Sequence, residues 1–223
     1  MGRGTRVSDD ATTLRPIQFR ARRTPSQTRS RDTVAVIVTA ATRVFAARGY
    51  AGATTNLIAE RAGVSVGSLY EYFASKDAIL VAVTQAHLDQ LSEVFRAVAM
   101  EVAQAPTSVE GAVRRFVTAV VEVHAANPKL HRVVSEEGPR SRRLQQRQRT
   151  LETELTAWVE QYLRSQDEIP LRDPALAATM LVQTIESVTH KVVIHGDGRL
   201  PIASYVEEIV ALAMGYLRSR AAS

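Results

Sequence analysis

The chain has 223 residues, of which 45% are hydrophobic, 23% are charged and only 5% are aromatic. That length is sufficient for one large or two small domains with a buried core. The chain contains no cysteine, which excludes disulfide bonds, thiolate metal sites and cysteine nucleophiles. The sequence shows no run of about 18 apolar residues and no apolar stretch behind its first charges, so we expect a soluble, cytoplasmic protein that does not span a membrane.

The net charge of +5 is concentrated at the N-terminal end of the chain. Residues 1–76 contain 12 Lys and Arg against 5 Asp and Glu, whereas residues 77–223 contain 16 against 18. A basic segment on a nearly neutral body favours a polyanionic partner, either nucleic acid or an anionic membrane.

The first 29 residues hold seven Arg, two Gly and two Pro without hydrophobic periodicity. This composition predicts a disordered basic arm over residues 1–29. Two interpretations of the arm stay open: a free tail, or an Arg-bearing segment that touches phosphates or the minor groove of DNA.

From Arg31 onward the apolar residues recur at helical spacing, which predicts an all-α chain. Gly49 ends the first helix, and Thr54 or Thr55 begins a short second helix to residue 62. Ser65 begins a third helix to residue 73, and Ser75 a long fourth helix to residue 104. Further helices are predicted over 108–126, 128–136, 140–166, 173–195 and 201–220.

Residues 54–70 have the pattern of a helix-turn-helix, in which two short helices meet at a tight turn. Ala59 is small where the two helices cross, Gly63 suits a turn with positive φ, and Leu69 fits the core between the helices. An ordinary helical corner has the same spacing. The preceding amphipathic helix and the basic surroundings favour the helix-turn-helix.

Several short blocks within residues 31–80 carry a more specific signal. They are Phe45-Ala-Ala-Arg-Gly-Tyr50, Thr54-Thr55, Ile58-Ala59 and Ala62-Gly-Val-Ser-Val-Gly-Ser-Leu-Tyr-Glu-Tyr-Phe-Ala-Ser-Lys-Asp77. In these blocks the chain resembles the TetR family of bacterial transcriptional regulators. The resemblance implies a homodimer with a three-helix DNA-binding domain at residues 30–76. It also implies a helical domain at residues 77–223 that dimerises and binds a small-molecule effector, which releases a repressor from palindromic operator DNA.

Chemistry and this resemblance together predict the residues that contact DNA. Gly67 lets the backbone approach the groove and Val66 suits a thymine methyl group, while Lys76 resembles the family's phosphate-clamping lysine. For the two tyrosines, simple packing is the alternative. The full expected set is Thr54, Thr55, Ser65, Val66, Gly67, Ser68, Tyr70, Tyr72 and Lys76. Residues 65–68 include no Arg, Asn or Gln that could read bases by hydrogen bonds. We therefore expect sequence readout through methyl contacts, DNA shape or the arm.

The last two predicted helices are apolar on more than one face, which predicts burial on two sides. The resemblance implies a four-helix dimer interface there, and a monomer core is the alternative. The expected interface residues are Leu181, Ile185, Val188, Tyr205, Ile209, Leu212 and Tyr216. The expected effector-pocket residues are Phe95, Trp158, Tyr162, Gln183 and Glu186, for which core packing or an exposed position is the alternative.

Two further groups of residues have a functional and a structural interpretation. One group comprises Arg140, Arg142, Arg143, Arg147 and Arg149, which form either a second anion site or, as we prefer, a solvated helix face paired with nearby glutamates. The other comprises the histidines His87, His124, His131, His190 and His195. They form either a metal site of two histidines and a carboxylate or, as we prefer, packed or surface residues, so no metal and no cofactor is predicted.

Three functions compete for this sequence. An effector-responsive repressor is preferred, and a helical DNA-binding protein without an effector is the alternative. An enzyme with a Ser, His and acid set is disfavoured, because no nucleophile elbow or phosphate loop positions such residues.

Overall fold

In the computed structural model of the chain, the described residues are 28–105, 107–137, 141–194 and 201–221. The predicted arm over residues 1–29 lies outside these ranges except for its last two residues. The helices are α1 (Thr28–Gly52), α2 (Thr55–Ala62), α3 (Val66–Tyr72), α4 (Lys76–Gln104), α5 (Val109–Ala126), α6 (Pro128–Glu137), α7 (Arg142–Arg164), α8 (Pro174–Thr189), the π-helix η2 (His190–Ile194) and α9 (Ile202–Arg220). The predicted all-α class is confirmed.

Short polar side chains begin several of these helices, because each satisfies a backbone N–H that lacks a partner in the first turn. Thr54 accepts a hydrogen bond from Leu57 N at 3.2 Å, and Ser75 accepts one from Ala78 N at 3.2 Å. Two helix ends differ from the prediction. The helix of α1 is interrupted at Gly49 (φ 66°, ψ 177°) but a last turn continues to Gly52, and α8 widens into η2 after Thr189.

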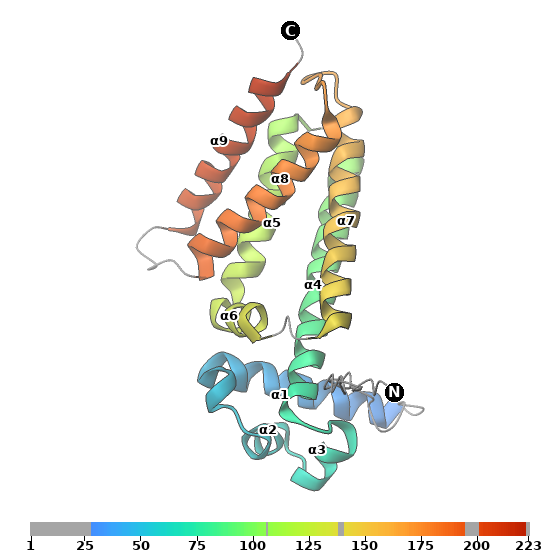
Figure 1. Ribbon diagram of the computed structural model, residues 1–223, viewed down its shortest axis with the longest axis vertical. Helices are drawn as coiled ribbons and strands as arrows, with labels where there is room; N and C mark the ends of the chain where they lie inside the picture. Colours follow the sequence, from blue (N-terminus) through green and yellow to red (C-terminus); the bar gives the residue numbers. More distant parts are fainter. Residues whose placement is uncertain (1–27, 106, 138–140, 195–200, 222–223) are drawn as a thin grey trace, which may run out of the picture.

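The helices form a lower and an upper body joined by the long helix α4 (Figure 1). The lower body consists of α1, α2 and α3, and the upper body of α5, α7, α8, α9 and most of α4. Helix α6 lies at the junction. Leu130 and Val133 of α6 belong to the same buried cluster as Ile37 and Phe45 of α1, so α6 completes the core of the lower body.

One segment of α1, Ser30–Gly52, is long and apolar enough to cross a membrane by length and composition alone. No continuous apolar run exists there, because Arg31, Asp32, Arg43 and Arg48 interrupt it. Ile37, Ala41 and Phe45 on this helix are fully buried in the lower core. We therefore interpret α1 as a core helix.

Candidate functional sites: the helix-turn-helix surface and the interior cavity

The turn between α2 and α3 has the geometry that the sequence predicts. Gly63 lies at φ +68°, and the N–H of Val64 donates to Ala59 O at 3.0 Å. Ala59 and Leu69 are fully buried, which holds the two helices at close distance. The pair therefore has the geometry of a helix-turn-helix, with α3 as its second helix.

Helix α3 turns its N-terminal residues to solvent. Val66 is 37% exposed, and Gly67 is also exposed. A Cβ atom placed on Gly67 would meet only Ser65 Oγ at 3.8 Å, which is an ordinary contact. Packing within the protein therefore does not require glycine at this position, whereas close approach of DNA backbone or bases would.

The hydroxyl groups predicted to contact DNA are partly used inside the protein. Ser65 Oγ accepts a hydrogen bond from Ser68 N at 3.0 Å, so it serves as the cap of α3. Thr55 Oγ1 and Tyr70 Oη lie 3.0 Å apart, which links the start of α2 to α3. Tyr70 is 42% exposed, whereas Tyr72 is half-buried against the lower core. Packing within the protein therefore accounts for Tyr72 better than for Tyr70.

Lys76 has a different environment from the one that the sequence predicts. Its ammonium donates to Tyr50 O at 2.8 Å and to Ala53 O at 3.0 Å, and it lies 4.1 Å from the centre of the Tyr50 ring. The Tyr50 hydroxyl in turn donates to Asp77. The ammonium therefore joins the end of α1 to the start of α4, and the expected phosphate contact of Lys76 stays a prediction.

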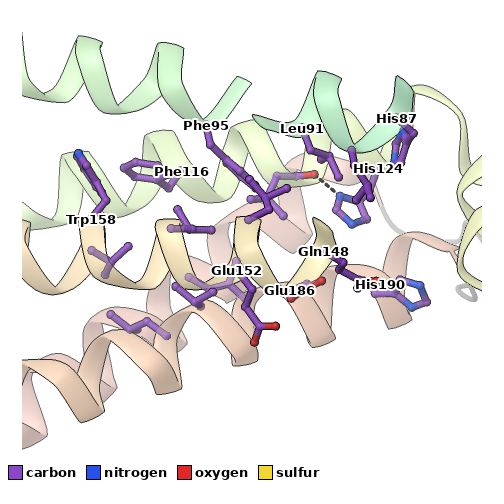
Figure 2. Close-up of a pocket in the computed structure, with 18 of the residues that line it drawn as sticks. His87, Leu91, Phe95, Phe116, His124, Gln148, Glu152, Trp158, Glu186 and His190 are labelled. Carbon is purple, nitrogen blue, oxygen red and sulfur yellow. Dashed lines mark hydrogen bonds between the residues drawn. The ribbon is translucent and has the colours of Figure 1, made fainter. Parts of the chain in front are cut away.

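The upper body encloses a cavity of about 240 Å³ between α4, α5, α6, α7 and α8. Its walls are mainly apolar, with Phe95, Phe116 and Trp158 among the lining residues (Figure 2). Tyr162 also lines it. The Trp158 ring packs against Phe116 at 4.7 Å and Tyr162 at 5.5 Å between ring centres. An apolar cavity with few polar groups is typical of a small-molecule site.

Glutamates also line this cavity. Burial raises the pKa of Glu186, and the neighbouring charge of Glu152 raises it further. Glu186 lines the cavity and is an exposed residue, which places it at the rim. Gln183 was expected in the same site but is exposed and does not line the cavity. The α8 residues that line the cavity are Leu181, Val182, Ile185 and Glu186, which share one side of the helix. Position 183 lies on another side.

The cavity is lined at its lower end by histidines that the sequence analysis interpreted as packed residues. Burial lowers the pKa of His87 to about 4 and that of His131 to about 2, with repulsion from neighbouring histidines adding to both shifts. In the described ranges no group of three or more His, Asp or Glu side chains is arranged to hold a metal ion. The helical spacing of each histidine was visible in the sequence, but their meeting across four elements was not.

The predicted dimer residues divide into buried, partly buried and exposed sets. Leu181 and Ile209 are buried in the upper core, so their side chains pack within one protomer. Ile185, Val188 and Tyr216 are half-buried against that core, and Tyr205 is half-exposed. Leu212 is 60% exposed, and Leu176 and Met180 of α8, which were not predicted, are 55% and 44% exposed.

The arginines of α7 do not form a compact anion site. Arg147 pairs with Asp89 at 3.4 Å, whereas Arg142, Arg143 and Arg149 are exposed. Arg140 and His195 lie outside the described residues. The preferred interpretation as a solvated face agrees with the exposure of Arg142, Arg143 and Arg149, and the partner of Arg147 is an aspartate on α4.

A helix-turn-helix domain joined through one long helix to a helical domain with an apolar cavity defines the class of two-domain DNA-binding regulators. Residues 37–83 match the sequence model of bacterial regulatory proteins of the tetR family. Residues 108–217 match the model of the tetracyclin repressor-like C-terminal domain. The chain belongs to the TetR family of bacterial regulators, as the resemblance of residues 31–80 implied.

Individual relatives agree with this assignment. The chain is 47% identical over 55 residues to the HTH-type transcriptional activator FasR of Mycolicibacterium smegmatis, a match that spans 25% of each chain. A TetR-family regulator from Mesorhizobium loti has a TM-score of 0.73 at 22% identity, covering 88% of this chain and all of the other. Bacillus subtilis FadR, in complex with stearoyl-CoA, has a TM-score of 0.60 at 21% identity. The match covers 80% of this chain and 96% of the FadR chain. These structural likenesses show the fold.

Proposed function

We propose that this protein is a cytoplasmic, sequence-specific regulator of transcription whose affinity for operator DNA is set by a small molecule in the interior cavity. The observation that carries the proposal is the position of α6. His131 and Val134 of α6 line the cavity, while Leu130 and Val133 pack in the core of the helix-turn-helix domain. A molecule in the cavity therefore contacts the helix that completes the DNA-binding domain.

The proposed DNA-binding unit is a homodimer. Leu176, Met180 and Leu212 form exposed apolar surface on α8 and α9, which suits burial against the same surface of a second copy. A two-fold dimer presents two α3 helices, which enter successive major grooves when their spacing is about 34–36 Å. The operator is therefore a palindrome.

The proposed mechanism is a shift between two populations of the dimer. An effector that binds better when α6 and α4 hold the recognition helices at another spacing favours that state. Release from DNA is limited by this difference in affinity between the two states. The relative FasR is named an activator, so the same coupling is compatible with repression or activation, of which we propose repression.

A DNA-binding protein without an effector is the second candidate. An apolar cavity of about 240 Å³ is far larger than the roughly 10–15 Å³ that one buried water needs, which favours the first candidate. FadR of Bacillus subtilis is described with stearoyl-CoA and AibR with isovaleryl coenzyme A and operator DNA. Those complexes support the proposal of a ligand for this chain but do not identify it.

The proposal is tested by selecting DNA from a random-sequence pool with the full-length protein. We expect enrichment of palindromes whose half-site centres lie about one helical turn apart. A Gly67→Leu variant, which places a bulky side chain at the exposed start of α3, is expected to lose the enrichment while its thermal melt stays unchanged. Enrichment of asymmetric sites, or none, contradicts the proposal.

A further inference from the structure

The lower end of the cavity is formed by a histidine cluster, which we define as His87 of α4, His124 of α5, His131 of α6 and His190 of η2. The Nε2 atoms of His87 and His131 lie 2.8 Å apart. The ring of His124 stacks on that of His131 with 4.0 Å between centres, and His190 lies 6.4 Å from His131. Figure 2 shows His87, His124 and His190 at the same end of the cavity.

The hydrogen bonds of His124 determine which of its ring nitrogens carries a proton. Its Nδ1 lies 2.7 Å from Val120 O, and a carbonyl oxygen only accepts, so Nδ1 is the donor. Burial lowers the pKa of His124, which leaves the ring neutral near pH 7. A neutral imidazole has a single N–H group. The Nε2 atom of His124 is therefore an acceptor, and the ring lines the cavity.

A buried hydroxyl at this end lacks a hydrogen-bond partner among the described residues. The Oγ1 atom of Thr84 is buried and makes no hydrogen bond among the described residues, although Thr84 lines the cavity one turn before His87. A buried polar group without a partner costs about 1–3 kcal/mol. A ligand group that bonds to Thr84 and His124 would recover part of that cost.

The charges around the cluster favour a neutral partner. The charges that shift the pKa values of His87, His124 and His131 come from one another and from His190. The acids that line the cavity, Glu152 of α7 and Glu186 of α8, are not among them. Glu186 and Lys191 lie beside His190, whereas the charges that shift the pKa values of His87, His124 and His131 come only from histidines. Around those three rings the lower end thus offers acceptors in an apolar setting.

We infer that His124 Nε2 accepts a hydrogen bond from the head group of the effector, which is an elongated, mainly apolar molecule with an uncharged hydrogen-bond-donating head. The lining of α7 extends from Leu144 to Leu163, which is about 28 Å of helix at 1.5 Å per residue and accommodates a long apolar body. This inference rests on the proposed function and specifies the chemistry of its ligand. Because His124 stacks on His131 of α6, the head group would lie one ring away from the coupling helix.

The test uses the intrinsic fluorescence of Trp158, which is the single tryptophan of the chain and lines the cavity. The probes are 1-decanol, which has a donor, and decyl methyl ether, which has none. We expect the wild type to bind 1-decanol about fivefold more tightly than decyl methyl ether, because one hydrogen bond of about 1 kcal/mol gives this ratio. The His124→Phe variant is expected to bind both probes equally. The Tyr162→Phe control removes another cavity hydroxyl that has no hydrogen-bond partner among the described residues, and it is expected to keep the preference.

Several results would overturn the inference. They are equal binding of the two probes by the wild type, a preference that survives in His124→Phe, or tighter binding of decyltrimethylammonium than of decanol, which would assign the head group to Glu152 and Glu186. If His124→Phe does not fold, Thr84→Val must reduce the preference at least about twofold. Equal binding of the probes leaves the proposed function standing, whereas a cavity that binds none of them contradicts both.

Discussion

Replacing Lys76 with methionine tests the environment of this lysine, because methionine keeps most of its length without the ammonium. The variant loses two charge-assisted hydrogen bonds, to Tyr50 O and Ala53 O, and the contact with the Tyr50 ring. Such hydrogen bonds contribute about 1.5–3 kcal/mol each, and an exposed cation–π contact about 0.5–1 kcal/mol. Both bonds come from one half-buried ammonium, so we expect a combined loss of about 2–3 kcal/mol in the free energy of unfolding.

The assay combines a thermal melt with DNA-binding titrations at several salt concentrations. A loss of this size lowers Tm by roughly 5–10 °C in a chain of this length. Because the ammonium is bonded within the protein, we expect the slope of log affinity against log salt to change by less than about 1 per dimer. A phosphate clamp in each subunit would change the slope by about 2. Lys191→Met, which removes an exposed charge on η2, is the control.

A slope change of about 2 with an unchanged Tm would refute this reasoning. It would restore the phosphate-clamping role that the family resemblance implies for Lys76. An unchanged slope together with a lowered Tm would establish the lysine as the residue that joins α1 to α4.

Four further predictions concern other parts of the molecule. Gly67→Ala leaves Tm unchanged or slightly raised, because alanine favours a helix by about 0.5–1 kcal/mol, yet weakens operator binding in an anisotropy titration; equal operator affinity would contradict the assignment of α3. Ser68→Ala changes the ratio of operator to random-DNA affinity by about 1–3 kcal/mol at most, and a parallel loss on both DNAs would show that Ser68 does not read bases. Leu212→Glu yields a monomer in sedimentation with an unchanged helical spectrum, since this side chain is 60% exposed; a persistent dimer would place the interface elsewhere. Stability to urea falls as pH drops from 6.5 towards 4, because His87 stays neutral when folded, with a pKa of about 4, but protonates when unfolded; the loss is at most about 1.4 kcal/mol per pH unit for this histidine, and a His87→Leu variant without a smaller slope would contradict it.

Local features of the fold were predictable from the sequence because they depend on neighbouring residues. The caps at Thr54, Ser65 and Ser75 and the positive φ of Gly63 appear where the residue types require them. Each of these interactions spans only a few residues, so its partner is fixed once the helix forms.

Features that depend on distant residues were not predictable in the same way. The carbonyl partners of Lys76 lie 23 and 26 residues earlier in the chain, and no spacing rule indicates them. In α8 and α9 the apolar residues surround much of the helix, so hydrophobicity alone did not separate buried Leu181 and Ile209 from exposed Leu212. The histidine cluster requires four elements to meet, which only the packing of the upper body determines.

The central claim is that filling the cavity changes the spacing of the two recognition helices. Because the chain has no cysteine, a single Glu71→Cys substitution on the exposed surface of α3 labels each protomer once. Pulsed electron spin resonance on the labelled dimer then compares the distance distribution with selected operator DNA, without DNA, and with 1-decanol. We predict that operator narrows the distribution and that decanol moves it away from the operator-bound distance. Identical distributions with and without a decanol concentration that saturates Trp158 fluorescence would contradict the account.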